Sequence, residues 1–281
     1  MFRQYPLTLQ IEPTRRCNLN CKICMRQNLS DKDSTLSLDD FKKILKSGNF
    51  QYVGLHGWGE PLLNPHLFQM IEYAESQGIY TNLTTNGTLI GENIDSIFGS
   101  GLTEIAFGVY DNQLLRSILP KIKDLVSERE RRELKIPQIY MDITIYKGNL
   151  DEIPDYLAHA AESEVDAVIL HRLFNVYKVD PAIEYISAKE EKGLFKELKR
   201  EAKKRSLKLY LPPKHSVPCR VVKRSIFVTA GGKVTPCCFL PEFYLGDALQ
   251  EGVNKVMSSK KYADFVKTMG KHPICGKCIS W

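Results

Sequence analysis

The eight cysteines are the residues whose type and spacing point most directly to chemistry in this chain. None lies between residues 25 and 218, so they form an amino-terminal group of three and a carboxyl-terminal group of five. Secreted disulfide-rich domains are short and carry cysteines throughout, so this distribution instead indicates two metal sites in a reducing compartment. The groups are Cys17, Cys21 and Cys24, followed by Cys219, Cys237, Cys238, Cys275 and Cys278.

The amino-terminal cysteines have the spacing C-x3-C-x2-C and follow an apolar run that ends at Pro13. Structural zinc sites normally use four protein ligands, and a 4Fe–4S cluster usually takes four thiolates. Three thiolates on one short loop would therefore leave one iron of such a cluster open. An open iron can bind a small chelating ligand.

A glycine-rich turn, Gly57-Trp58-Gly59-Glu60-Pro61, follows a second strand-like run. Glycines let the backbone approach a ligand closely, and the Glu60 carboxylate is suited to pair with an ammonium group. The alternative is that the glycines only make a tight exit from the strand.

A third turn, Thr85-Asn86-Gly87, closes the next strand-like run. Asn-Gly pairs also form ordinary turns, so a ligand role and a turn role for Asn86 both remain open.

These motifs lie in a stretch, residues 5 to about 211, in which strand-like and helix-like segments alternate as six units. Helices between successive strands imply right-handed crossovers and a parallel sheet. Because a closed barrel needs eight units, we expect an α/β fold, a partial (β/α)6 barrel, with its active face at the carboxyl ends of the strands. A doubly wound sheet is the alternative. The expected strands are 7–13, 52–60, 79–87, 104–110, 138–146 and 166–174, and the expected helices are 37–48, 66–78, 92–101, 112–135, 150–163 and 187–206.

The cysteine loop and the two turns, in this order after three successive strands, resemble the radical S-adenosylmethionine (radical SAM) enzymes. The resemblance implies that three cysteines hold three irons of a 4Fe–4S cluster and that S-adenosyl-L-methionine chelates the fourth. It further implies cleavage to methionine and a 5′-deoxyadenosyl radical, which abstracts a hydrogen atom from the substrate. The implied metal ligands are Cys17, Cys21 and Cys24, and the implied cofactor contacts are Ile23, Gly57, Trp58, Gly59, Glu60 and Asn86.

Two positions depart from the family pattern. Ile23 stands where many members carry an aromatic residue near adenine, although a backbone contact survives that change. The fourth strand ends in Phe107-Gly108-Val109-Tyr110-Asp111 and lacks the serine of the family's ribose contact, so no ribose ligand is assigned there.

The pattern changes after residue 213. Two β-rich runs around Gly231-Gly232 predict a hairpin over residues 225–237, and one short helix is expected near residues 251–269. This part is poor in apolar residues, so bound metal would have to contribute much of its folding free energy. We therefore expect a core domain over residues 1–213 and a small cluster-binding domain over residues 214–281.

The tail resembles the twitch module, which is the reduced form of the SPASM domain. A full SPASM module holds two auxiliary clusters, and the five cysteines here suffice for one 4Fe–4S cluster. The implied ligands are Cys219, Cys237, Cys275 and Cys278, with Cys238 either a bystander or the ligand in place of Cys237. Structural zinc is the alternative, because C-x2-C pairs are common in zinc ribbons.

Four cysteines on four irons leave no open site for substrate, so we expect the auxiliary cluster to accept an electron from the substrate radical. This favours an oxidoreductase that dehydrogenates a small molecule, supplied by a one-electron donor such as flavodoxin or ferredoxin. Maturation of a precursor peptide is the nearest alternative. RNA modification and a non-enzymatic electron carrier are the other classes.

Charge and hydrophobicity indicate that neither nucleic acid nor a membrane is the expected partner. The net charge of +6 decides little, and the mixed charges near residues 187–206 indicate a solvated helix face, so nucleic acid is not the expected partner. No apolar run reaches the roughly 18 residues of a membrane helix, and we find no secretory signal, so we expect a cytoplasmic protein. Further candidates near strand ends, each with a structural alternative, are His56, Tyr110, Arg116 and His171-Arg172.

Overall fold

The computed structural model describes residues 7–174, 176, 185–213 and 219–279. The chain divides into two compact units. Unit 1 comprises residues 1–20, 24–83 and 214–281, and unit 2 comprises residues 21–23 and 84–213. Among the described residues, none of the helices combines the length and the apolar composition needed to cross a bilayer.

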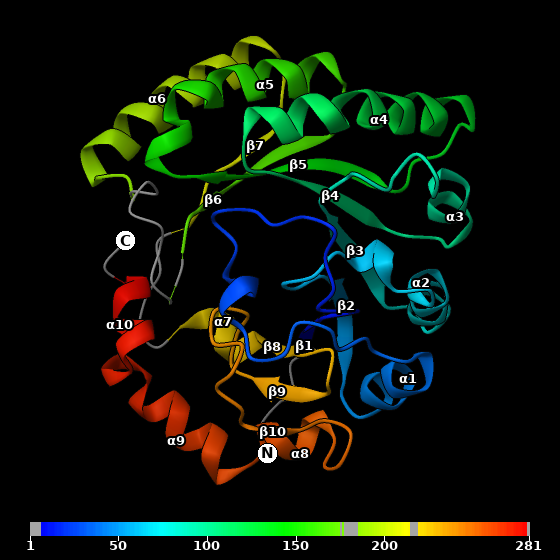
Figure 1. Ribbon diagram of the computed structural model, residues 1–281, viewed down its shortest axis with the longest axis vertical. Helices are drawn as coiled ribbons and strands as arrows, with labels where there is room; N and C mark the ends of the chain where they lie inside the picture. Colours follow the sequence, from blue (N-terminus) through cyan, green and yellow to red (C-terminus); the bar gives the residue numbers. More distant parts are fainter. Residues whose placement is uncertain (1–6, 175, 177–184, 214–218, 280–281) are drawn as a thin grey trace. The chain divides into compact units, whose positions relative to one another are not determined.

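The sheet of unit 1 is built from β1 (Leu7–Ile11), β2 (Phe50–Leu55), β3 (Tyr80–Thr85), β8 (Ser225–Val228), β9 (Lys233–Thr235) and β10 (Gly246–Asp247). β1 lies between β8 and β2 and pairs with both in parallel, and β2 pairs in parallel with β3. The pairs β8–β9 and β9–β10 are antiparallel. The predicted hairpin is therefore present, and Figure 1 shows it continuing the sheet on the far side of β1 from β2.

Capping and apolar spacing explain the helices of unit 1, which are α1 (Leu38–Lys46), α2 (Leu67–Ser76), α7 (Arg220–Arg224), α8 (Val253–Met257), α9 (Lys260–Thr268) and α10 (Pro273–Ile279). Ser37 caps α1, because its Oγ accepts a hydrogen bond from the Asp40 backbone N–H at 3.1 Å. Gly78 follows α2 with a φ of +72°, which glycine adopts without strain.

The single helix expected near residues 251–269 is two helices, α8 and α9. The Ser259 hydroxyl caps a new start by accepting a hydrogen bond from the Tyr262 backbone N–H at 3.2 Å. The sequence pattern also missed α10, because its residues were interpreted only as a metal-binding motif.

Unit 2 contains four parallel strands in the order β4 (Glu104–Val109), β5 (Gln138–Ile145), β6 (Ala167–Arg172) and β7 (Leu209–Tyr210). Its helices are α3 (Ile94–Gly99), α4 (Asn112–Arg131), α5 (Ile153–Glu162) and α6 (Ala188–Lys204). Figure 1 shows α4, α5 and α6 along one side of this sheet.

The two faces of β5 differ in polarity. Ile139, Met141, Ile143 and Ile145 are buried, and the residues between them, which include Asp142, are partly exposed. Alternation along a strand sends these two sets to opposite faces. Unit 2 therefore has an apolar face toward its helices and a polar face away from them.

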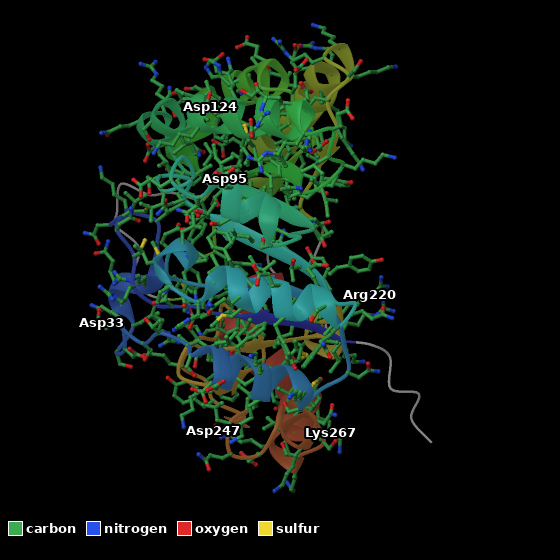
Figure 2. The ribbon with its side chains drawn as sticks, turned by 90° about the vertical axis from the view of Figure 1, so that its right-hand side faces the viewer. Asp33, Asp95, Asp124, Arg220, Asp247 and Lys267 are labelled. Atoms are coloured by element: carbon green, nitrogen blue, oxygen red, sulfur yellow. The ribbon has the colours of Figure 1, made fainter. Side chains whose placement is uncertain are left out.

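The fold confirms the expected α/β class, and β1 to β6 alternate with helices in the expected order. Figure 2 labels Asp95 on α3 and Asp124 on α4, and both are exposed on solvated helix faces. On α6, Lys204 Nζ lies 2.9 Å from Glu201 Oε1, so this mixed-charge helix neutralises part of its own charge.

Candidate functional site

The amino-terminal cysteines lie in the loop that follows β1. Cys17 and Cys24 belong to unit 1, and Cys21 is counted with unit 2. Cys24 Sγ accepts a hydrogen bond from the Arg26 backbone N–H at 3.5 Å. Burial raises the pKa of the Cys24 thiol, and the nearby Cys17 thiol raises it further, whereas the Arg26 N–H opposes both. A bound cation would favour the thiolates at this position.

Polar contacts hold this loop in place. The Arg26 guanidinium donates hydrogen bonds to the carbonyl oxygens of Arg15 and, at 3.1 Å, of Lys32. The hydroxyls of Thr14 and Thr35 lie 2.8 Å apart across the base of the loop. The cysteines are therefore presented on a braced loop.

The glycines of the second turn are needed for packing. A Cβ on Gly59 would lie 2.1 Å from the Thr14 carbonyl oxygen, and one on Gly57 would lie 2.2 Å from Glu12 Cγ. The Gly59 contact is with backbone, which has little freedom to move. The turn consequently rests directly on the segment that leads into the cysteine loop.

Glu60 and Asn86 both make local turn contacts. Glu60 is 1% exposed, and its Oε1 accepts a hydrogen bond from the Leu62 backbone N–H at 3.1 Å. In unit 2, Asn86 Oδ1 accepts from the Thr88 backbone N–H at 3.0 Å. This is the turn role that the sequence left open for Asn86.

Trp58 and Ile23 occupy different environments. The Trp58 indole Nε1 donates to the Cys238 carbonyl oxygen at 3.0 Å. Ile23, in unit 2, is 9% exposed and packs with Leu173, and partly buried tyrosines, Tyr110, Tyr146 and Tyr185, pack against them.

The carboxyl-terminal cysteines come from three elements of unit 1. Cys219 precedes α7, Cys237 follows β9, and Cys275 and Cys278 share one face of α10 because they are three residues apart. Burial raises the pKa of Cys278 to about 11, with Cys219 and Cys275 adding to the rise. Burial also raises the pKa of Cys237, and the thiols of Cys275 and Cys278 act on it in the same direction. Cys275 and Cys278 thus lie within electrostatic reach of both Cys219 and Cys237.

Cys238 faces a different set of groups. Burial raises the pKa of its thiol to about 12, the Gln10 side chain opposes the rise through a hydrogen bond, and the Glu12 carboxylate adds to it. Gln10 also lies 3.1 Å from His56, measured from Nε2 to Nδ1.

The donor chemistry of both groups fits iron–sulfur ligation. Within the described residues, no three His, Cys, Asp or Glu side chains converge closely enough to hold a single metal ion. Each thiolate of a cluster binds a different iron, so the sulfur atoms surround the cluster and need not meet at one ion.

The candidates at β6 have separate environments. His171 Nε2 lies 3.1 Å from Asp142 Oδ1 on the neighbouring strand. Arg172 instead binds Glu191 on α6, with Nη2 at 3.0 Å from Oε1. Arg116 is exposed on α4. His171 therefore lies on the polar face of unit 2, and Arg172 connects its strand to helix α6.

Sequence reasoning missed Glu12 and Arg15. Arg15 Nε donates to Glu12 Oε2 at 2.7 Å, and the two side chains are 1% and 0% exposed. The signal was present, since two oppositely charged residues, Glu12 and Arg15, lie three apart directly after a buried strand. Their partners come from distant segments, which only the fold brings together.

Comparisons with known proteins agree with this arrangement. Residues 11–113 match the model of the Radical SAM superfamily. Residues 219–279 match the SPASM iron–sulfur cluster-binding domain.

Three curated relatives illustrate the range of similar proteins. The tungsten-containing aldehyde ferredoxin oxidoreductase cofactor-modifying protein of Pyrococcus furiosus is 26% identical, over 59% of this chain and 51% of that protein. The PqqA peptide cyclase of Bradyrhizobium diazoefficiens is 26% identical, over 57% and 45% respectively. The chain thus spans about half the length of these two relatives. A probable GTP 3′,8-cyclase of Sulfurisphaera tokodaii is 25% identical over 82% of this chain and 80% of that protein.

Solved structures share the fold. Streptococcus suis SuiB bound to its precursor peptide SuiA superposes with a TM-score of 0.72 at 16% identity, covering 99% of this chain and 67% of SuiB. The enzyme anSMEcpe with bound AdoMet and a peptide gives a TM-score of 0.70 at 14% identity, covering 94% and 83%. On the two family matches, the chain contains a radical SAM domain and a SPASM-type domain, and together these domains imply one S-adenosylmethionine-binding 4Fe–4S cluster and one auxiliary 4Fe–4S cluster.

Proposed function

We propose that this protein carries out a radical oxidation of a small-molecule substrate. The observation that carries the proposal is that Cys275 and Cys278 lie near both Cys219 and Cys237, because four thiolates would fully ligate an auxiliary cluster, which then has no site for substrate and is suited to accept an electron. The proposed ligands are Cys219, Cys237, Cys275 and Cys278.

We assign the fourth position to Cys237 rather than Cys238. The thiol of Cys237 is influenced by Cys275 and Cys278, whereas Cys238 is influenced by Gln10 and Glu12. We further propose that residues 1–213 form the functional core domain and residues 214–281 the cluster-binding domain. The β-sheet pairing of β8 with β1 joins these two parts structurally.

The proposed cofactor site consists of Cys17, Cys21 and Cys24 with Ile23, Gly57, Trp58, Gly59, Glu60 and Asn86. When S-adenosylmethionine and its cluster are bound and reduced by a donor such as flavodoxin or ferredoxin, they supply a carbon-centred radical that abstracts hydrogen. Gly57 and Gly59 bring the turn backbone close to the cysteine loop. The buried Glu60 carboxylate would pair with the ammonium group of the methionine moiety when the cofactor is bound.

Net oxidation of a carbon beside a hydroxyl or amine also releases a proton, and we propose that His171 accepts it. Asp142 holds the His171 imidazole at 3.1 Å on the polar face of unit 2. A carboxylate in this position stabilises the imidazolium that forms. His171 is the penultimate residue of β6, at the carboxyl end of a parallel strand, where parallel α/β folds bind ligands.

Peptide modification is the second candidate. It is supported by the SuiB and anSMEcpe structures, which were solved with peptides, and by the PqqA peptide cyclases among the relatives. The probable GTP 3′,8-cyclase of Sulfurisphaera tokodaii aligns over 82% of this chain and 80% of its own length. Its name refers to a small molecule, GTP, which supports the small-molecule assignment.

The test is anaerobic reconstitution followed by incubation with reductant and S-adenosylmethionine. We expect 5′-deoxyadenosine to form, and its yield to rise when a metabolite fraction is added. Stimulation by a peptide fraction alone would favour peptide modification. If no 5′-deoxyadenosine formed under any condition, the result would favour a non-enzymatic electron carrier over an enzyme. Salt-dependent tRNA binding would instead support RNA modification.

A further inference from the structure

A short segment directly after Cys237 contacts the amino-terminal loops at three places. We call residues 238–242 the bridging segment. The Cys238 carbonyl accepts from Trp58 Nε1 at 3.0 Å, and the Pro241 carbonyl accepts from Arg15 Nη2 at 3.3 Å. Glu242 Oε1 accepts from the Ser30 backbone N–H at 2.8 Å. The bridging segment therefore fastens to the glycine-rich turn and to both ends of the cysteine loop.

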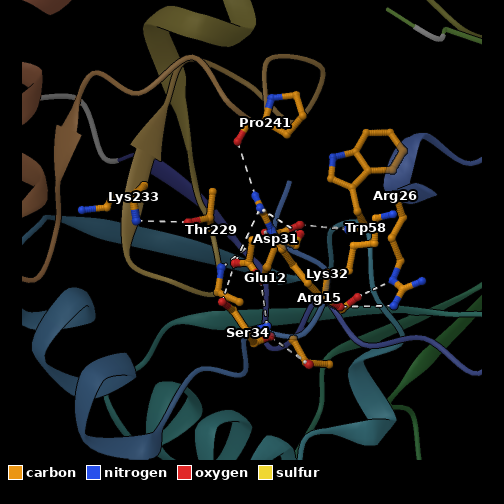
Figure 3. A network of polar contacts seen from close by, with 12 residues as sticks. Glu12, Arg15, Arg26, Asp31, Lys32, Ser34, Trp58, Thr229, Lys233 and Pro241 are labelled. Carbon is orange, nitrogen blue, oxygen red and sulfur yellow. Dashed lines mark hydrogen bonds and ion pairs between the residues drawn. The ribbon is translucent and has the colours of Figure 1, made fainter. Parts of the chain in front are cut away.

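One buried carboxylate fixes the geometry of these contacts. Glu12 accepts hydrogen bonds from Arg15 Nε at 2.7 Å, from the Trp58 backbone N–H at 3.1 Å and from the Ala230 backbone N–H at 3.3 Å. Figure 3 shows this network around Glu12 and Arg15, with Trp58 and Pro241 on it. Because a buried charge must keep its partners, the turn, the cysteine loop and the β8–β9 hairpin hold one relative arrangement.

Trp58 makes hydrogen bonds both to Glu12 and to the bridging segment. Its backbone N–H is fixed to Glu12, and its indole is fixed to the peptide group that follows Cys237. The next residue, Gly59, rests on the Thr14 carbonyl, so the turn cannot shift without the cysteine loop. Any displacement of the Cys238 carbonyl when Cys237 takes up its ligand position reaches the turn through the Trp58 indole.

We infer that Trp58 is a positioning residue that couples the auxiliary cluster to S-adenosylmethionine binding, so that loading of the auxiliary site tightens the affinity for S-adenosylmethionine. The inference rests on the proposed ligand assignment of the cysteines. Coupling between two binding sites is reciprocal, so each site affects the affinity of the other by the same factor. Typical coupling free energies change an affinity by about five-fold or more.

The experiment is a double-mutant cycle on the anaerobically reconstituted protein, read as the dissociation constant for S-adenosylmethionine. The four proteins are wild type, Cys275→Ala/Cys278→Ala, Trp58→Phe, and the combination of all three substitutions. Removing the auxiliary cluster should weaken binding about five-fold in the Trp58 background. In the Trp58→Phe background the same removal should change binding less than about two-fold, because the link is already broken.

A matched variant separates the hydrogen bond from ring packing. The Trp58 and Phe239 ring centroids lie 6.4 Å apart, so Phe239→Leu alters the ring contact and leaves the indole N–H in place. This variant should keep the coupling. Equal weakening by the cysteine substitutions in both Trp58 backgrounds, or no weakening in either, would overturn the inference.

A second measurement uses no cysteine variant. S-adenosylmethionine should slow the loss of the auxiliary cluster's own electron paramagnetic resonance signal to a chelator in wild type, and should not do so in Trp58→Phe. Protection that is equal in the two proteins contradicts the role of Trp58. Iron analysis distinguishes a failure of the coupling through Trp58 from a failure of the auxiliary ligand assignment. If the iron content of Cys275→Ala/Cys278→Ala equals that of wild type, the ligand assignment is wrong.

Discussion

Glu12 and Arg15 form an ion pair in the interior of unit 1, with Arg15 Nε 2.7 Å from Glu12 Oε2 and exposed fractions of 0% for Glu12 and 1% for Arg15. The pair closes the turn between β1 and the cysteine loop, and its remaining hydrogen bonds reach the glycine-rich turn and the auxiliary hairpin. Charges this deeply buried are stable only when fully partnered.

Glu12→Gln should therefore destabilise the protein strongly. The substitution leaves the buried Arg15 guanidinium with only the partly exposed Asp31 carboxylate, 3.8 Å from its Nη1, as a counter-charge, and the expected loss is about 3–5 kcal/mol in the free energy of unfolding. Anaerobic denaturant titration measures it. Asp264→Asn is the matched control, because the Lys260–Asp264 pair is 89% and 54% exposed and should contribute less than about 1 kcal/mol. Similar losses for both variants would contradict the structural role of Glu12.

Neighbouring cysteines provide a sharp test of the auxiliary ligands. Reconstituted wild type should hold about eight irons per chain, and Cys237→Ala should hold about four. Cys238→Ala should keep about eight, since its thiol faces Gln10 and Glu12. The measurement is iron and sulfide quantitation with electron paramagnetic resonance. Retention of eight irons by Cys237→Ala, with loss in Cys238→Ala, would reverse the assignment.

The amino-terminal cluster has its own prediction. Cys17→Ala/Cys21→Ala/Cys24→Ala should lower the iron content from about eight to about four per chain. It should also abolish 5′-deoxyadenosine formation, while the auxiliary spectroscopic signal persists. If this variant still formed 5′-deoxyadenosine, the cofactor site would have to lie elsewhere.

Activity should depend on pH through His171. Partial desolvation lowers the pKa of His171, whose side chain is 54% exposed, but the Asp142 carboxylate at 3.1 Å outweighs this effect and leaves the pKa above its ordinary value. A raised pKa keeps the imidazole protonated to higher pH, so the proton-accepting form, and with it the rate, appears only above that pKa. Asp142→Asn removes the carboxylate and should move this acid limb to lower pH.

The pH profile of the rate, measured at saturating S-adenosylmethionine, tests this assignment. His159→Asn is the control, because His159 lies on α5, 3.5 Å from Glu162, and should leave the profile unchanged. An acid limb that stays in place in Asp142→Asn shows that another group titrates.

Gly59→Ala should impair both stability and cofactor binding. Its Cβ would lie 2.1 Å from the Thr14 carbonyl oxygen, and overpacking against backbone costs about 1–3 kcal/mol. The turn would have to move away from the cysteine loop, so the affinity for S-adenosylmethionine should fall as well. Gly91→Ala is the control, since no heavy atom lies within 4 Å of the added Cβ. Thermal unfolding and equilibrium binding measure the two effects.

The sequence by itself determined the local features of this protein. The order of strands and helices follows from apolar periodicity and caps such as Ser37, which act within a few residues. The metal chemistry follows from the spacing of Cys17, Cys21 and Cys24, because three thiols on one short loop need no distant partner to be recognised.

Only the tertiary structure decided which distant residues meet. Cys237 and Cys238 are adjacent and chemically identical in the sequence, and their difference arises from the side chains that face each thiol. The pairing of β8 with β1 and the burial of Glu12 with Arg15 likewise depend on contacts between segments more than 200 residues apart. Local patterns carry no information about such contacts, since packing and desolvation are set by the neighbours that the complete fold supplies.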